Sequence, residues 1–204
     1  MEILTSAHLF QRSTLHPLPR EFFSRDPVSV ARELLGHFLV HETAQVRCVG
    51  RIVEVEAYGG EDDPASHARV RTPRSEIMWG APGIAYVYFI YGNHHCLNVV
   101  TEPEGIPGAV LIRALEPLEG IEWMQRRRGV EKLTLLASGP GRLTQAMGIN
   151  LSHNGWDLTR PPLYIADGSP TPFEVEATPR IGVIAAKERL WRFYIRGSPF
   201  VSRR

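Results

Sequence analysis

The segment from residue 46 to residue 58 constrains the fold most. Apolar and polar side chains alternate along it, which is the pattern of a β-strand with two different faces. One face carries apolar residues, and the other carries Glu54, Glu56 and Tyr58. Carboxylates two positions apart on a strand lie about 7 Å from each other on one face. The strand therefore presents two acids such as hydrolysis of a glycosidic bond requires; ordinary acids on a solvent-exposed face are the alternative.

Most of the remaining periodic segments also predict strands. Together with residues 46–58, the expected strands are residues 38–42, 84–91, 96–101, 109–114, 163–166, 173–177, 181–185 and 191–196. One helix should begin at Asp26-Pro27 and end before Gly36, because Asp caps helices and Pro fits their first turn. Further helices are expected at residues 119–128 and after Ser138. Strands dominate, so we expect an α+β fold with a curved, mostly antiparallel sheet, formed by one domain at residues 21–204 after an N-terminal tail at residues 1–20.

Two further regions carry candidate functional residues. Gly92-Asn93 predicts the turn of a hairpin, with Tyr91 at its tip, where it favours a wedge or interface residue. Tyr86 and Tyr88 share one strand face, where core packing is the alternative. The long segment 60–82 reads as a loop, and loops of this length in a compact domain are often functional. It contains His67, which could contact a nucleic-acid base or serve a structural role.

The composition excludes several classes of protein. The net charge of the 204 residues is +1, so binding to nucleic acid would require a local basic patch. Two cysteines, Cys48 and Cys96, cannot form a disulfide framework, and no secretory signal or membrane-spanning run is visible. An intracellular protein, in the cytoplasm and nucleoid or in a nucleus, is expected. Motifs of dinucleotide-binding proteins, P-loop proteins, zinc proteases and serine hydrolases are missing from the sequence.

Six stretches in one order resemble the alkyladenine (3-methyladenine) DNA glycosylase family. They are residues 52–58 (IVEVEAY), 72–74 (TPR), 86–92 (YVYFIYG), 111–117 (LIRALEP), 138–140 (SGP) and 192–199 (RFYIRGSP). The resemblance extends over about residues 22–202. It implies a single domain with flanking helices and a protruding β-hairpin that inserts into DNA. It also implies an enzyme without metal or other cofactor that removes alkylated or deaminated purines from double-stranded DNA.

The resemblance also assigns roles to individual residues. Glu56 would activate the water that breaks the N-glycosidic bond, with Arg113 and the main chain of Ile181 helping to hold that water. The base pocket would consist of Tyr58, His67, Tyr88 and Asn98, of which Asn98 would exclude guanine. Aromatic faces attract cations, which would favour alkylated purines. Tyr91 would intercalate, whereas Thr72, Arg71, Arg74 and Arg142 would contact the DNA backbone.

Two other functions are compatible with the sequence. A damage-binding module on the same scaffold would keep the pocket and the wedge but would activate no water. A hydrolase of free nucleosides would use Glu54 and Glu56 but would have no role for Tyr91. The expected partner in the first two cases is damaged double-stranded DNA, bound by a monomer away from any membrane.

Overall fold

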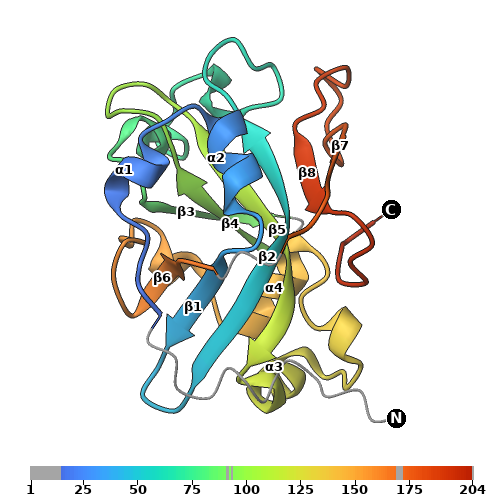
Figure 1. Ribbon diagram of the computed structural model, residues 1–204. Coiled ribbons are helices and arrows are strands. Elements are labelled where there is room, and N and C mark those ends of the chain that lie inside the picture. Colours follow the sequence, from blue (N-terminus) through green and yellow to red (C-terminus); the bar gives the residue numbers. More distant parts are fainter. Residues whose placement is uncertain (1–14, 91, 93, 169–171, 204) are drawn as a thin grey trace.

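Eight strands form one curled antiparallel sheet that resembles half a barrel (Figure 1), which confirms the α+β prediction. The computed structural model describes residues 15–90, 92, 94–168 and 172–203. The strands are β1 (Phe38–Glu42), β2 (Arg47–Tyr58), β3 (Ala85–Ile90), β4 (His94–Val100), β5 (Ala109–Glu119), β6 (Leu163–Ala166), β7 (Val175–Thr178) and β8 (Arg192–Ile195). Their main order is β3-β4-β5-β2-β1-β6, and β8 pairs with both β2 and β7.

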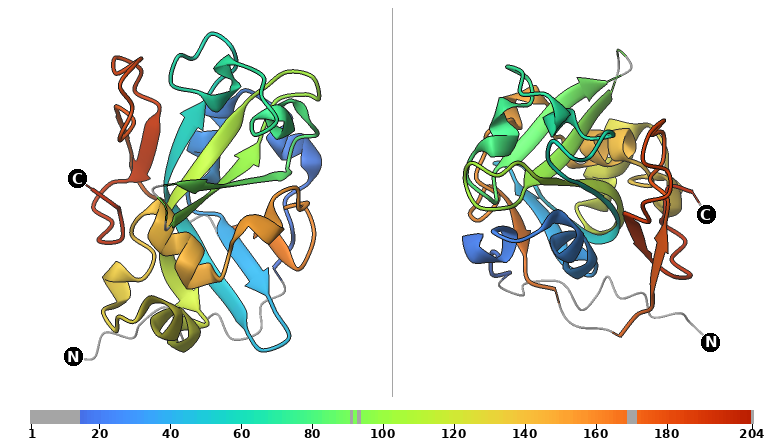
Figure 2. Two further views of the ribbon diagram at one scale, coloured as in Figure 1. Left: turned by 180° about the vertical axis from the view of Figure 1, so that it is seen from behind. Right: turned by 90° about the horizontal axis from the view of Figure 1, so that it is seen from above.

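Four α-helices accompany the sheet in the described part of the chain: α1 (Arg20–Phe23), α2 (Pro27–Leu34), α3 (Ile121–Arg128) and α4 (Pro140–Met147). Helix α2 begins as predicted, because the Asp26 side chain accepts hydrogen bonds from the main-chain N–H groups of Val28 and Ser29. Its buried residues pack against β2 and β5, whereas α4 packs against β4 and β5. In Figure 1 α2 lies in front of β2, and α4 comes to the front in the view from behind (Figure 2). The two helices cover apolar surface that the curled sheet would otherwise expose.

Strand β2 lies at the branch of the sheet. Its first half pairs with β1, and Glu54, Val55 and Glu56 pair on the same edge with β8. Along its other edge, the pairing with β5 shifts register three times. Glu54 lies opposite Ala114 and Val55 lies opposite Ile112, so Arg113 is an extra residue on β5. Such a bulge turns a side chain out of the regular ladder, and this one lies beside both acids.

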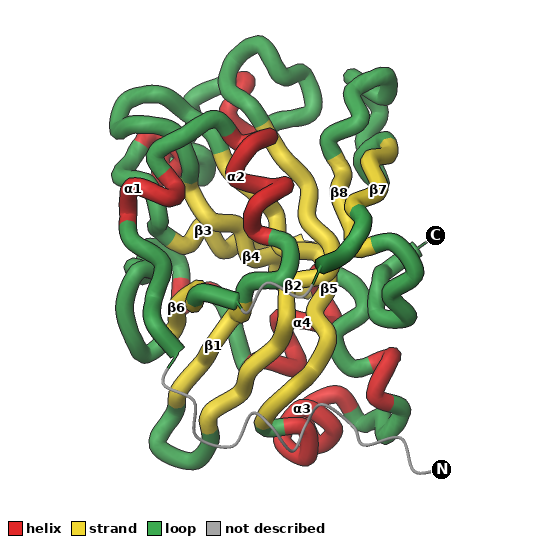
Figure 3. Tube along the Cα trace, viewed as in Figure 1, coloured by secondary structure: helices red, strands yellow, loops and turns green. Residues whose placement is uncertain are grey.

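The segment 181–185 differs from its prediction as a strand. Within the described residues this segment is irregular. Figure 3 shows the segment between β7 and β8 as loop. Gly182 and Ala186 have φ values of +78° and +51°, which an extended strand does not allow. The Ile181 N–H donates to the side chain of Glu56 on β2 rather than to the main chain of a neighbouring strand. The prediction failed because it rested on apolar residues alone.

Two boundaries also differ from the expected ones. Leu18, placed in the expected tail, is buried and its N–H donates to Ile165 O at 2.8 Å. Strand β5 continues through Pro117, which lies at a register shift where no ladder N–H is needed. Strands β3 and β4 pair with each other, but Tyr91 and Asn93 at the expected tip lie outside the described residues, so the insertion of Tyr91 stays a prediction. No helix in the described part of the chain combines the length and apolar character needed to cross a membrane.

Candidate active site

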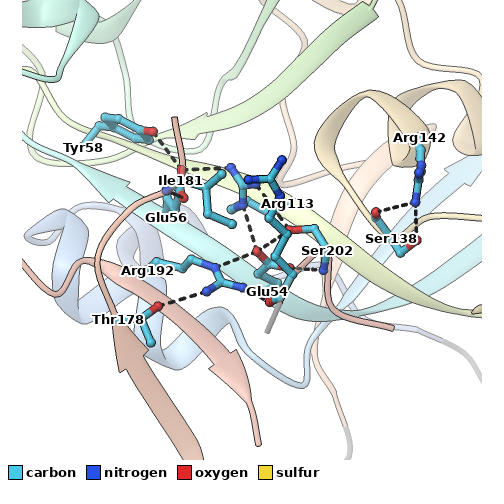
Figure 4. Close-up of polar contacts among 11 residues, drawn as sticks. Glu54, Glu56, Tyr58, Arg113, Ser138, Arg142, Thr178, Ile181, Arg192 and Ser202 are labelled. Atoms are coloured by element: carbon cyan, nitrogen blue, oxygen red, sulfur yellow. Dashed lines mark hydrogen bonds and ion pairs between the residues drawn. The ribbon is translucent and has the colours of Figure 1, made fainter. Parts of the chain in front are cut away.

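Glu56 is the centre of a buried polar cluster (Figure 4), and no part of it is exposed to solvent. Its Oε1 accepts a hydrogen bond from the main-chain N–H of Ile181 at 2.6 Å. Its Oε2 accepts one from the Tyr58 hydroxyl at 2.8 Å and one from Arg113 Nη1 at 3.1 Å. All three partners are hydrogen-bond donors. The carboxylate thus accepts one hydrogen bond on Oε1 and two on Oε2.

Glu54 is also fully buried and anchors Arg113 from the opposite side. Its Oε1 accepts from Arg113 Nε at 2.9 Å, from Arg192 Nε at 2.8 Å and from the Ser202 hydroxyl at 2.7 Å. Its Oε2 accepts from the Ser202 N–H at 2.5 Å. Burial alone would raise the pKa of Glu54, but Arg113, the Ser202 N–H and Arg192 outweigh it and hold that pKa below its usual value. Arg113 therefore lies between two buried acids, and the Ser202 side chain, which accepts from Arg113 Nη2, helps to fix it.

A second buried ion pair fixes the residue that precedes Ile181. Arg180 and Asp63 are both fully buried in their side chains, with N–O distances of 2.6 and 2.8 Å. Arg180 also donates to Ala57 O at 3.0 Å, and Asp63 accepts from the Gly59 N–H at 3.0 Å. In Figure 1 the two loops that carry this pair, after β2 and after β7, rise side by side. The pair thus holds the Ile181 N–H in place against Glu56.

A cavity of about 810 Å³ opens beside this cluster. Its volume is in the range of small-molecule sites. Glu56 lies behind the wall, and its three hydrogen-bond partners Tyr58, Arg113 and Ile181 all line the cavity. Other lining residues are His67, Tyr86, Tyr88, Ile90, His94, Cys96, Asn98, Leu111 and Arg142. The structure therefore brings all four predicted base-pocket residues into one cavity next to Glu56.

The aromatic part of the wall forms a connected cluster. The His67 ring packs edge-on to Tyr88 with centroids 4.8 Å apart, and its Nδ1 lies 2.9 Å from the Tyr86 hydroxyl oxygen. Partial burial and the nearby Arg74 charge hold the pKa of His67 below its usual value, so the ring is neutral at pH 7. Burial and the Glu56 carboxylate raise the pKa of Tyr58, whose hydroxyl stays protonated as a donor. Asn98 Nδ2 donates to Tyr86 O at 3.1 Å.

The residues predicted to contact the DNA backbone do not all lie at the cavity. Arg142 lines the cavity and donates to the Ser138 hydroxyl at 3.1 Å. Arg71 lies away from the cavity and forms a two-bond pair with Glu76 at 2.8 and 2.5 Å, and Thr72 bonds to Ser75 in the same loop. Arg74 lies over the Tyr88 ring. Among the described residues, no three His, Cys, Asp or Glu side chains are grouped as metal ligands would be.

Sequence reasoning missed several members of the cluster. Asp63 and Arg180 are 117 positions apart, and Glu54 and Ser202 are 148 positions apart. No local spacing links residues at such separations. The acidic start of the loop at residues 61–63 was the one available signal, because a buried acid needs a basic partner.

The chain is similar to known proteins over most of its length. The sequence model of the family described as methylpurine-DNA glycosylase (MPG) matches residues 21–199. Relatives named "Putative 3-methyladenine DNA glycosylase" include one from Prosthecochloris aestuarii, which is 49% identical over 90% of each chain. The relative from Clostridium acetobutylicum is 49% identical over 91% of this chain and 97% of its own. The relative from Methanoculleus marisnigri is 50% identical over 92% of this chain and 99% of its own.

Proposed function

The chain belongs to the methylpurine-DNA glycosylase family, and from this premise we propose that it excises damaged purines from double-stranded DNA by hydrolysis. The damaged nucleotide is flipped out of the duplex into the cavity, because its glycosidic bond is inaccessible inside the stack. Water then replaces the base and leaves an abasic site. The family match does not favour a module that only binds damage, nor a hydrolase of free nucleosides.

The buried Glu56 carboxylate is the observation that carries this proposal. In the proposed reaction the carboxylate would accept a hydrogen bond from water and then take its proton, as a general base. Its negative charge would also stabilise the oxocarbenium-like sugar that develops as the bond breaks. The hydrogen bonds from Arg113 and Ile181 support a fixed orientation of the carboxylate. In this mechanism Arg113 and the main chain of Ile181 hold the water, either by fixing Glu56 or by contacting the water directly.

The base is proposed to lie between Tyr58 on one side and His67 with Tyr88 on the other. Their shared position in the cavity wall supports this arrangement. Asn98 would exclude guanine by crowding its exocyclic amine, which is consistent with its burial and its bond to Tyr86 O. Tyr91 would fill the gap that the flipped nucleotide leaves in the duplex.

Basic side chains would hold the DNA backbone. The position of Arg142 at the cavity supports a phosphate contact there, and we extend this role to Arg71, Thr72 and Arg74. We also propose that the protein acts as a monomer.

Release of free base from duplex oligonucleotides tests the proposal. Each duplex carries one hypoxanthine, one ethenoadenine or one alkylated purine, with an undamaged duplex as control. We expect release from at least one damaged duplex and none from the control. Tight binding to all damaged duplexes without release would favour the damage-binding module, and equal rates on a free alkylated nucleoside and on duplex would favour a nucleoside hydrolase.

A further inference from the structure

Three different residues hold the guanidinium of Arg113, one at each of its nitrogens (Figure 4). Nε donates to Glu54 Oε1 at 2.9 Å, and Nη1 donates to Glu56 Oε2 at 3.1 Å. Nη2 donates to the Ser202 hydroxyl oxygen at 3.4 Å. The contacts to the two acids leave the planar group free to turn about the line that joins them. The contact to Ser202 opposes this rotation.

The Ser202 hydroxyl also fixes the acid that anchors Arg113. It donates to Glu54 Oε1 at 2.7 Å, and the Ser202 N–H donates to Glu54 Oε2 at 2.5 Å. Ser202 therefore contacts both oxygens of the carboxylate. Hydrogen bonds to charged groups are stronger than those between neutral groups. One hydroxyl thus donates to the acid and accepts from the arginine, and it bridges the two.

The segment that carries Ser202 is itself tied down on both sides. Before it, Phe200 packs against the main hydrophobic core. After it, the main-chain carbonyl of Arg203 accepts a hydrogen bond from Arg192 Nη2. Within the described residues the cavity lining includes Arg203 but not Ser202. Ser202 can therefore act on a bound nucleotide only through the residues that it contacts behind the wall.

We propose that Ser202 is a positioning residue for base excision, and that its hydroxyl holds Arg113 in the orientation that directs the Glu56 carboxylate at water. The inference rests on the proposed function and adds a residue to it. Orientation matters to the rate, because a displacement of about 1 Å can slow a reaction about a hundredfold. Without the hydroxyl, Glu56 keeps its hydrogen bonds from Tyr58 and Ile181. Loss of Ser202 should therefore slow the reaction only in part.

The test measures the single-turnover rate of base release and the Kd on one damaged duplex that wild type cleaves. Ser202→Ala removes the hydroxyl and keeps the main-chain N–H. The rate at saturating protein should fall about three- to tenfold, the scale of one hydrogen bond. The Kd should stay within about twofold of wild type, because Ser202 lies outside the cavity lining. A role in stability alone would lower the thermal midpoint and leave the rate of the folded protein unchanged.

Two further substitutions at the same position separate the hydroxyl from its shape. Ser202→Thr keeps the hydroxyl and should restore the rate to within about twofold of wild type. Ser202→Cys has a similar shape but is only a weak donor, so it should be as slow as Ser202→Ala. Ser202 is half-buried and none of the three changes is large, and the thermal midpoint of each variant confirms that it is folded.

Ser198→Ala is the matched control. Ser198 is a half-buried serine of the same segment, and its hydroxyl oxygen accepts from the Phe200 N–H at 3.3 Å. Its loss tests whether any serine hydroxyl of the segment affects the reaction. Both the rate and the Kd should stay within about twofold of wild type.

Three results would overturn the inference while leaving the proposed function in place. Ser202→Ala could release the base as fast as wild type, or Ser202→Thr could be as slow as Ser202→Ala. Ser202→Ala could also raise the Kd and leave the rate at saturating protein unchanged, which would give the segment a role in DNA binding. Failure of the wild-type protein to release any damaged base would instead overturn the proposed function, and the inference with it.

Discussion

Replacement of Glu54 by Gln should destabilise the folded protein strongly, although it only exchanges one carboxylate oxygen for an NH2 group. The carboxylate is fully buried and accepts four hydrogen bonds, two of them from the guanidiniums of Arg113 and Arg192. The Gln amide that replaces it is neutral. Its own N–H groups would face the donors of Arg113, Arg192 or Ser202, with which they cannot form hydrogen bonds. Loss of the acid also leaves the cluster with one uncompensated positive charge.

The size of the effect follows from this geometry. Removal of one partner from a buried ion pair costs about 3–5 kcal/mol of unfolding free energy. With a urea dependence of about 2 kcal/mol/M, the unfolding midpoint should fall by about 1.5–2.5 M. Glu116→Gln on β5 is the control, because Glu116 is half-buried and pairs with Arg51 at 3.7 Å. Its loss should cost less than about 1 kcal/mol.

The pH dependence adds a second test of the same residue. The pKa of Glu54 is lower in the folded protein than its ordinary value of 4.5, because Arg113, Ser202 and Arg192 together outweigh burial. Its stabilisation is therefore fully present above the unfolded pKa and is lost as the pH falls through the folded one. Urea unfolding at pH 7 and at decreasing pH below 4.5 should show the gap between wild type and Glu54→Gln shrinking. A loss under 1 kcal/mol at pH 7, or a gap that widens in acid, would refute the reasoning.

Three further predictions concern the site and its DNA. Tyr58→Phe keeps the ring but removes a hydrogen bond to a charged acceptor, which is a loss of about 1.5–3 kcal/mol. Single-turnover excision should therefore slow about ten- to hundredfold. An unchanged rate would exclude a role for the hydroxyl. Tyr91→Ala should reduce excision from duplex DNA more than from single strands, and an equal loss on both would contradict intercalation. Affinity for duplex DNA should fall as salt rises, because phosphate contacts release counterions; affinity that does not change between low and high salt would argue against binding to the backbone.

Much of the sheet could be predicted from local pattern. Residues 46–58 alternate between apolar and polar side chains, and Gly and Pro residues mark the turns between predicted strands. These two patterns place most strands within a few residues of their observed bounds. Asp26-Pro27 predicts the start of α2 because a cap is a local contact between neighbours. Pro117 shows the limit of this reasoning. A proline predicts the end of a strand, but Pro117 lies inside β5, next to a register shift in its pairing with β2.

The arrangement of the site depends on contacts that local pattern cannot reveal. The bulge at Arg113 follows from how β2 and β5 register against each other, which no single segment determines. The pairing of Asp63 with Arg180 and of Glu54 with Ser202 joins distant parts of the chain. The acids could be recognised as candidates from their spacing on one strand. Their full burial and their division into an anchor, Glu54, and the proposed water-binding group, Glu56, required the fold.

The most direct test of the account is a parallel measurement on Glu56→Gln. Single-turnover base release and equilibrium binding are measured on the same damaged duplex, with wild type and Glu116→Gln alongside. The account predicts that release falls by about 10²–10⁴-fold, the contribution of a general base, while the Kd stays within about threefold and reports a folded protein. Base release within tenfold of wild type would contradict Glu56 as the group that activates water.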